Sequence, residues 1–151
     1  MTTPNQTGTL APDEFAREDE KVIDLAAFIA EYLGKPNTGD TPGNLGQCVG
    51  LVEKWLDANG KPHVWGNADQ LLDNADRKVY KRVANIPTNA PPPGAVVCWN
   101  NTWGDGFGHT AIVVAANVRA LVVFEQNDPI GSPPVVATHN YNGVAGWLVF
   151  S

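Results

Sequence analysis

Residues 108–127 read GHTAIVVAANVRALVVFEQN, two apolar β-type runs on either side of a short polar turn. The runs, residues 110–115 and 120–124, lie so close in sequence that we predict an antiparallel hairpin. When the second run folds back along the first, the polar residues that follow it, 125–127, come alongside His109. The hairpin therefore brings a histidine together with a glutamate and two side-chain amides at one end of the predicted sheet.

The length of the turn decides which polar residue faces the imidazole. If the three residues 117–119 make the turn, His109 lies opposite Asn127, and Glu125 is its diagonal neighbour. A turn of even length places Gln126 opposite His109 instead, because side chains alternate between the two faces of a strand. A contact between His109 and either Glu125 or Asn127 therefore requires an odd turn or a one-residue bulge.

The rest of the chain extends this pattern outward. Further short β-rich runs are separated by turn signals and occupy residues 95–99, 135–138 and 147–150. Apolar residues at helical spacing predict earlier helices at 12–33, from 48 to a stop near 60, and at 68–75. Helices followed by strands indicate an α+β fold, with N-terminal helices packed on an antiparallel sheet of about five or six strands.

The composition of the 151-residue chain fits one globular domain. Hydrophobic residues make up 43% and charged residues 17%, which is too apolar for a disordered protein. No apolar run is long enough to cross a membrane, and we expect no secretory signal at the start. We expect residues 1–11 to form a flexible tail and residues 12–151 a single domain. Ten basic against 16 acidic residues give a net charge of −6, which argues against a nucleic-acid binder.

The two cysteines, Cys48 and Cys98, are too few for a disulfide framework, and the chain has no zinc-binding spacing. Cys48 stands where a Gly-rich loop becomes a helix. There the helix dipole and unpaired backbone N–H groups favour a thiolate and could stabilise an oxyanion. The position also suits a small core residue, the commoner role of an isolated cysteine. Cys98 lies in an apolar run, so we expect a buried thiol.

A nucleophilic cysteine needs a base, so the histidines decide between these interpretations. His63 follows Pro62 in a turn and His139 ends a β-rich run, so we expect both on the surface. His109 follows glycines and opens an apolar strand. It is therefore held by the sheet and reachable from outside, although alone it fits a structural role equally well.

Four segments now stand in order along the chain: GQCVGLV at 46–52, WGNA at 65–68, GHTAIV at 108–113 and EQN at 125–127. Together they resemble the CHAP family, cysteine- and histidine-dependent amidohydrolases and peptidases within the papain-like and NlpC-type group. The resemblance extends over roughly residues 33–150. It implies a papain-like α+β fold and hydrolysis of an amide bond in bacterial peptidoglycan, as in phage endolysins or virion-associated lysins.

The resemblance also implies roles for individual residues. Cys48 would be the nucleophile and His109 the general base and acid. Glu125 matches the usual orienting residue and Asn127 a second polar position lining the site, and which of them orients His109 stays open. Gln47 matches a position of the oxyanion hole, although it could equally be a helix-start residue turned to water.

Further residues complete the expected site. Trp65 and Trp103 are candidates for substrate binding, although Trp103 could equally pack beneath its own loop. Several phage CHAP domains carry an aspartate-rich calcium loop before the cysteine, whereas residues 39–44 hold a single carboxylate here. Since calcium prefers several carboxylates, we predict no metal and no cofactor. A basic cluster most simply forms a solvated helical face, or else touches an anionic wall: Arg77, Lys78, Lys81 and Arg82.

The partner implied by the resemblance is bacterial peptidoglycan, and we expect a monomer that does not insert into membranes. A phage-encoded enzyme would stay in the host cytoplasm until a separate pore released it, or would be virion-associated. Amidases and endopeptidases share these residues, so the bond cleaved stays open. Two alternatives remain: a catalytically silent wall-binding or virion structural module on the same fold, and a papain-like amidase with a non-wall substrate.

Overall fold

The computed structural model describes residues 24–151. Its helices are α2 (Leu25–Tyr32), α3 (Cys48–Ala58) and α4 (Leu71–Asn74), and its 3₁₀ turns are Pro42–Asn44, Ala68–Gln70 and Gly104–Gly106. The strands are β1 (Lys81–Ala84), β2 (Val96–Trp99), β3 (His109–Ala116), β4 (Leu121–Glu125), β5 (Val135–His139) and β6 (Val144–Val149). The expected tail, residues 1–11, lies outside the described residues, so a single domain from residue 12 stays a prediction.

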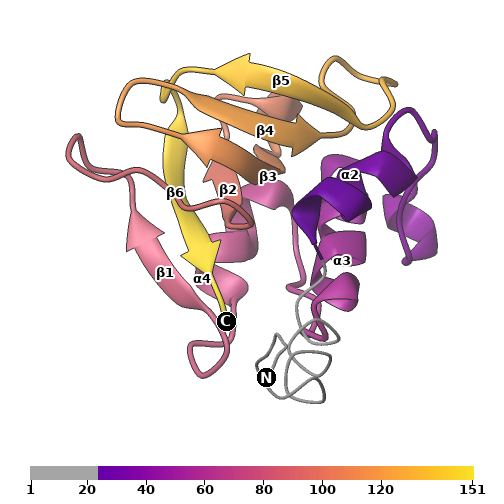
Figure 1. Ribbon diagram of the computed structural model, residues 1–151, viewed down its shortest axis with the longest axis horizontal. Helices are drawn as coiled ribbons and strands as arrows, with labels where there is room; N and C mark the ends of the chain where they lie inside the picture. The colour runs from indigo at the N-terminus through magenta and orange to yellow at the C-terminus, as the bar shows by residue number, and fades with distance from the viewer. Residues whose placement is uncertain (1–23) are drawn as a thin grey trace, which may run out of the picture.

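The strands in the described part of the chain form one antiparallel sheet in the order β1-β6-β2-β3-β4-β5 (Figure 1). The predicted α+β fold with an antiparallel sheet is thereby confirmed. Strand β1 was not predicted, because most of its residues are exposed and it lacks an apolar alternation. The predicted helix at 68–75 is instead a 3₁₀ turn followed by one turn of α-helix.

The first described helix begins later than its apolar spacing predicts. Asp24 has an extended backbone and caps α2, since its side chain accepts a hydrogen bond from the Ala26 N–H at 3.0 Å. The prediction of one continuous helix over residues 12–33 is therefore wrong, because the backbone at Asp24 is not helical. The helix buries Phe28, whose ring packs edge-on against Trp55 of α3.

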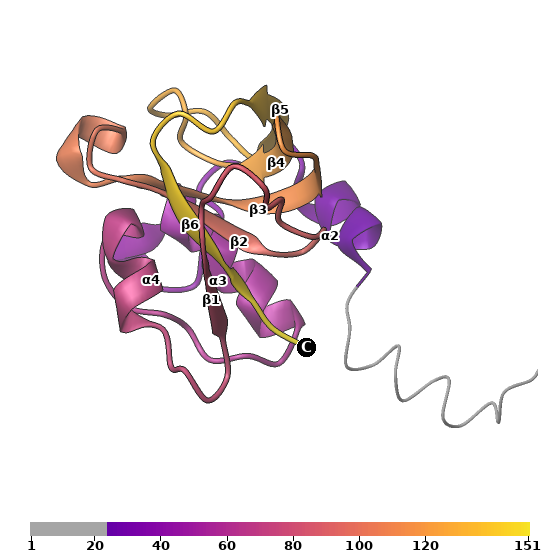
Figure 2. The ribbon, with the colours of Figure 1, turned by 90° about the vertical axis from the view of Figure 1, so that its left-hand side faces the viewer.

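The core lies on both faces of the sheet. On one face, helices α2, α3 and α4 pack against alternate residues of the central strands, such as Val96 and Cys98 of β2 (Figure 2). On the other face, Val97 and Trp99 join a second buried cluster with Trp147. Both faces of β2 are buried, which explains why its sequence is a continuous apolar run. The strand packs in the same buried cluster as α3.

The β3–β4 hairpin reaches the register that a contact between His109 and Glu125 needs through a one-residue bulge, which was one of the two alternatives, and not through an odd turn. Ala116 pairs with Leu121, so an even connection of residues 117–120 joins the strands. A bulge between Val113 and Ala115 adds one residue to β3 and brings Ile112 opposite Phe124. His109 lies three residues before Ile112 and Glu125 one residue after Phe124, so both side chains lie on the same face of the sheet.

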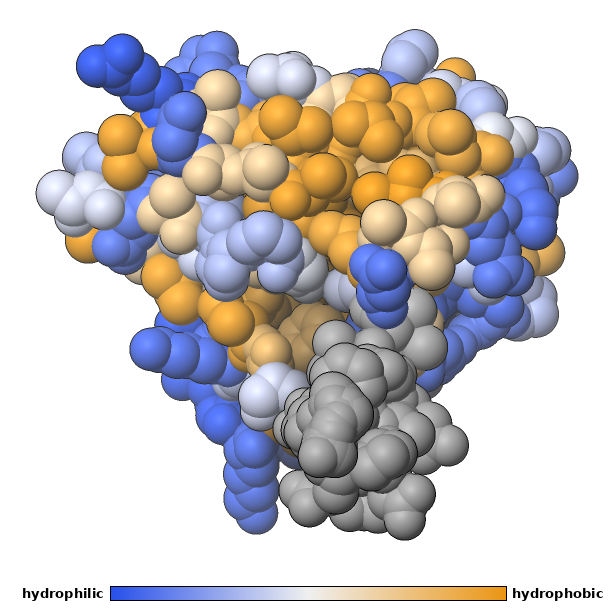
Figure 3. All heavy atoms as spheres, in the orientation of Figure 1, coloured by the Kyte–Doolittle hydropathy of each residue, from blue (hydrophilic) through white to orange (hydrophobic). Residues whose placement is uncertain are grey.

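Part of the sheet surface is left apolar. Val136 of β5 pairs with Phe124 and shares its face of the sheet, yet its side chain is 47% exposed. Figure 3 shows apolar side chains gathered over the upper half of this view, where β4 and β5 lie in Figure 1. Among the helices of residues 24–151, none is both long and apolar enough to span a bilayer.

Candidate active site

Cys48 lies at the first turn of α3, where the sequence changes from loop to helix. Gly46 has a φ of +80°, which only glycine adopts readily, and Gln47 is the extended N-cap residue before the helix. The thiol is half-buried and lines a cavity of about 420 Å³. The first two N–H groups of α3, those of Cys48 and Val49, have no acceptors within the helix and are available beside the thiol, whereas the Gly50 N–H donates to Gln47 O at 3.0 Å.

His109 lines the same cavity as Cys48. It is 3% exposed, and its Nε2 lies 2.9 Å from Oε1 of Glu125 on the neighbouring strand. The ring of Trp103 stacks on the imidazole with centroids 6.0 Å apart. Because Glu125 binds Nε2, the other ring nitrogen, Nδ1, is the one left for Cys48.

Charge and hydrogen bonding favour the imidazolium form of His109. Burial lowers the pKa of His109, but hydrogen bonds to Cys48 and Glu125 and the negative charges of both outweigh it and raise the pKa to about 9. Burial raises the pKa of Glu125, but hydrogen bonds from His109 and His139 and their charges lower it overall. The arrangement can therefore hold a carboxylate and an imidazolium side by side near neutral pH, next to the Cys48 side chain.

Asn127 contacts Gln47 and not His109. Its Nδ2 donates to Oε1 of Gln47 at 3.2 Å, and its Oδ1 accepts from the Gly131 N–H at 2.7 Å. Glu125 is thus the residue that binds the imidazole in this structure. Since the Gln47 oxygen is taken by Asn127, the Gln47 side-chain NH₂ is the end that remains for a ligand in the cavity.

Gln126, which an even turn without a bulge would place opposite His109, binds the loop before α3 instead. It is 1% exposed and binds the backbone of the loop before α3 on both sides. Its Oε1 accepts from the Thr38 N–H at 3.1 Å, while its Nε2 donates to Thr38 O at 3.0 Å and to Gln47 O at 2.7 Å. The tip of β4 therefore fixes the chain that leads to Cys48. A glutamine between two site residues was the only signal for this contact.

The prediction that His139 lies on the surface is wrong. Its side chain is 16% exposed, and Nε2 lies 2.8 Å from Oε1 of Glu125. His139 pairs with Leu121, and Leu121 shares a face of β4 with Glu125, so both side chains point to the same side of the sheet. The position of His139 at the end of a β-rich run does not by itself predict this contact with Glu125.

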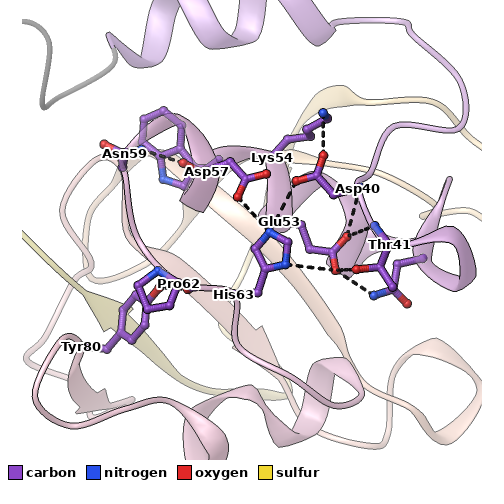
Figure 4. A network of polar contacts seen from close by, with 11 residues as sticks. Asp40, Thr41, Glu53, Lys54, Asp57, Asn59, Pro62, His63 and Tyr80 are labelled. Atoms are coloured by element: carbon purple, nitrogen blue, oxygen red, sulfur yellow. Dashed lines mark hydrogen bonds and ion pairs between the residues drawn. The ribbon is translucent and has the colours of Figure 1, made fainter.

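His63 is also more buried than predicted. Its side chain is 19% exposed, and Nε2 lies 2.9 Å from Oδ1 of Asp57, within a polar network around Glu53 (Figure 4). His63 is not among the residues that line the cavity of Cys48. The turn beside Pro62 brings it back onto α3.

The aromatic candidates lie differently from one another. Trp103 packs against Trp99, with ring centroids 5.3 Å apart, and against His109. Trp65 is 62% exposed beside the cavity-lining residue Gly66. Two exposed apolar residues that sequence reasoning missed, Phe107 and Ile130, line the cavity itself.

The remaining predicted groups lie apart from this cavity. Cys98 is fully buried, and burial raises the pKa of its thiol to about 12. The basic cluster lies on the turn after α4 and on the exposed strand β1, so its placement on a helical face is wrong: Arg77, Lys78, Lys81 and Arg82. Arg82 pairs with Asp73 at 2.6 Å.

The loop before Cys48 does not suit a calcium ion. Its single carboxylate, Asp40, lies 2.6 Å from Nζ of Lys54, which already balances its charge. Ligand atoms of Asp40, Asp57 and His63 lie within 4.8 Å of one another, as do those of His109, Glu125 and Asp128. Neither group offers the several free carboxylates that calcium prefers, which agrees with the expectation from the sequence. That the protein binds no metal stays a prediction.

Residues 37–127 match the CHAP domain family. The chain belongs to the CHAP family. It is 32% identical over 130 residues to the endolysin PlyTW of Staphylococcus phage Twort, an alignment that covers 76% of this chain and 27% of that endolysin. The chain thus spans about a quarter of the length of this curated relative.

Solved structures share the fold of this CHAP domain. The endolysin LysIME-EF1 superposes with a TM-score of 0.63 at 24% identity, over 82% of this chain and 61% of that one. PlyC superposes with a TM-score of 0.60 at 21% identity, over 91% of this chain and 38% of that one. The family match includes Cys48, His109 and Glu125, whereas His139 lies beyond its end.

Proposed function

We propose that this CHAP domain is the catalytic module of a peptidoglycan hydrolase, most simply a phage endolysin or a virion-associated lysin. Its reaction would be hydrolysis of an amide bond of the bacterial cell wall. The observation that carries the proposal is the shared cavity of Cys48 and His109, with the imidazole held by the buried Glu125. The relationship to an endolysin supports peptidoglycan as the substrate.

The first half of the reaction is acylation. The Cys48 thiolate attacks the amide carbonyl carbon, and the negative charge moves to the carbonyl oxygen. The backbone N–H of Cys48 and the side-chain NH₂ of Gln47 donate to this oxyanion. His109 then gives the proton on Nδ1 to the amide nitrogen, so the C–N bond breaks and the amine leaves.

The second half releases the acyl group. A water molecule attacks the thioester carbon while His109 Nδ1 accepts one of its protons. The second tetrahedral intermediate collapses, the C–S bond breaks, and Cys48 is again a thiolate beside the imidazolium. Glu125 keeps His109 in the tautomer with hydrogen on Nε2 throughout, which is the geometry of the 2.9 Å contact.

Asn127 has a separate role in this scheme. By holding Oε1 of Gln47, it fixes which end of the Gln47 amide faces the cavity. Phe107 and Ile130 offer exposed apolar contacts to the substrate at the cavity, and Trp65 lies next to the cavity-lining residue Gly66. A phage-encoded protein would be made in the host cytoplasm and reach the wall through a separate pore.

The test compares the two cysteines. Cys48→Ala should abolish release of new amines from purified peptidoglycan, whereas Cys98→Ala, which removes the buried thiol, should keep it. Iodoacetamide at neutral pH should label Cys48 and spare Cys98, because the pKa of Cys98 is raised to about 12 by burial. Mass spectrometry of the products then identifies the amide, since an amidase frees stems that begin with L-Ala and an endopeptidase creates new peptide termini.

Three outcomes would contradict the proposal. If Cys48→Ala still releases amines at the wild-type rate, Cys48 is not the nucleophile. If the wild-type protein sediments with walls and releases no amines, the domain is a wall-binding or structural module. If it cleaves small amides and leaves peptidoglycan intact, it is an amidase for another substrate.

A further inference from the structure

One carboxylate oxygen of Glu125 is shared by two histidines. Oε1 lies 2.9 Å from Nε2 of His109 and 2.8 Å from Nε2 of His139. The side chains are 2%, 4% and 16% exposed for Glu125, His109 and His139, so water competes little for these hydrogen bonds. A carboxylate oxygen accepts hydrogen bonds and has no hydrogen to give, so each Nε2 carries the hydrogen.

The His139 ring is held in place by its surroundings. It packs edge-on against Trp99 and Trp103, with ring centroids 5.3 Å away in each case. The same two tryptophans also pack against His109. The two imidazoles therefore approach Glu125 from one aromatic surround, and neither ring can turn without disturbing it.

We propose that His139 is a second positioning residue of the candidate active site, which donates from Nε2 to Glu125 and thereby sets how Glu125 binds His109. The inference rests on the proposed function for its kinetic consequences. His139 does not line the cavity of Cys48, so it acts through Glu125 and not on the substrate. In the described part of the chain, this contact joins β5, which lies beyond the family match, to the reacting groups.

The shared oxygen gives His139 an effect on proton chemistry. The titratable groups around His109 are Cys48 from α3, Glu125 from β4, His139 from β5 and Asp128 from the loop after β4. A donor from His139 draws part of the negative charge of Glu125 away from the His109 imidazolium. Without that donor, the carboxylate favours the imidazolium more strongly, so the pKa of His109 rises further above its ordinary value.

The test uses two variants of His139 and one matched control. His139→Phe keeps an aromatic ring against Trp99 and Trp103 but removes the donor, and His139→Gln restores a donor. We expect His139→Phe to lower kcat roughly tenfold, the effect of one hydrogen bond to a charged group, with KM nearly unchanged. The alkaline limb of the pH–kcat/KM profile should move to higher pH, and His139→Gln should return it toward the wild type.

The control is His63→Phe, which removes the other histidine that lies 2.9 Å from a carboxylate. It should leave the alkaline limb in place. NMR titration of the His109 ring provides a readout that needs no activity, and thermal melting identifies variants that fail to fold. His139→Gln covers the case in which the phenylalanine variant does not fold.

Two results would overturn the inference. The first is a folded His139→Phe protein with wild-type kcat and wild-type titration of His109. The second is a loss of kcat that His139→Gln fails to restore, with the His109 titration unmoved, which would make His139 a packing residue only. Failure of the proposed function looks different, because either Cys48→Ala would then retain hydrolysis or the wild-type protein would release no amines from peptidoglycan. In both cases the NMR titration of His109 still answers the question about His139.

Discussion

Glu125 and Glu53 are both almost fully buried, at 2% and 4% exposure, and each is surrounded by polar side chains that include a histidine. Burial raises the pKa of each carboxyl group, but hydrogen bonds outweigh burial and lower it overall. We refer to Glu125, His109, His139 and Asp128 as the site cluster. The loop cluster consists of Glu53, Asp40, Thr41, Lys54, Asp57 and His63, which are labelled in Figure 4, together with Asn44, whose Nδ2 donates to Oε2 of Glu53.

The two clusters differ in what donates to the glutamate. Glu125 accepts from two imidazoles, which can gain and lose protons, and one of them faces Cys48. Glu53 accepts from donors that keep their hydrogens at neutral pH: the backbone N–H groups of Asp40 and Thr41, the Thr41 hydroxyl and the Asn44 amide. The site cluster can therefore take part in proton transfer, whereas the loop cluster fixes the loop that leads to Cys48.

The largest effect should follow from neutralising the site cluster. Glu125→Gln removes the charge that stabilises the His109 imidazolium, so we expect kcat to fall by roughly 100-fold or more. The pKa of His109 should fall as well, since Glu125 helps to raise it to about 9. The alkaline limb of the pH profile should then move to lower pH, opposite in direction to His139→Phe. A variant that keeps the wild-type limb would show that Glu125 does not control His109.

The matching change in the loop cluster should act on stability first. Glu53→Gln replaces an acceptor of four hydrogen bonds by an amide whose NH₂ group faces other donors. We expect a loss of about 2 kcal/mol in the free energy of unfolding, measured by urea titration. The alkaline limb should stay where it is in the wild type. If that limb moved as in Glu125→Gln, the division between the two clusters would be wrong.

The sequence predicted those parts of the candidate active site that depend on local signals. Cys48 follows from the change between a Gly-rich loop and a helix, and His109 from its place behind glycines at the start of a strand. The rule for register was also within reach, because the alternation along a strand requires an odd turn or a bulge. Of the odd turn and the bulge, the structure has the bulge, at Val113–Ala115, and no residue pattern specified it.

The contacts that were missed join residues far apart in sequence. Gln126 binds the backbone of Thr38 across 88 positions, and Glu53 binds the loop that folds back over its own helix. Hydrophobic periodicity indicates which face of an element is buried, but not which polar group meets another after packing. His139 is the clearest case, since its pairing with Glu125 depends on how β5 lies beside β4.

Acid should reduce the stability that each of the two clusters contributes to the fold, and the Glu53→Gln variant can isolate the share of the loop cluster. Each glutamate has a folded-state pKa below its ordinary value of 4.5. The stability that each contributes is therefore present above pH 4.5 and is lost as the pH falls through the lowered folded-state value. Glu53→Gln should unfold with a flatter dependence on pH in this range than the wild type, as followed by circular dichroism. An equally steep dependence would mean that Glu53 is not linked to acid unfolding.

The smallest effect should come from removing divalent cations. Asp40 is neutralised by Lys54 at 2.6 Å, and both oxygens of Glu53 already accept hydrogen bonds, so the loop is organised by the protein's own donors. We expect excess EDTA to change the rate of amine release by less than about twofold, and added calcium to leave the melting temperature unchanged. Lys54→Ala sharpens the test, because it exposes the charge of Asp40 without supplying further carboxylates. A rise in the melting temperature of the wild type with calcium would show that the loop cluster binds a cation. The two clusters would then differ by a bound metal ion and not by the hydrogen-bond donors to their glutamates.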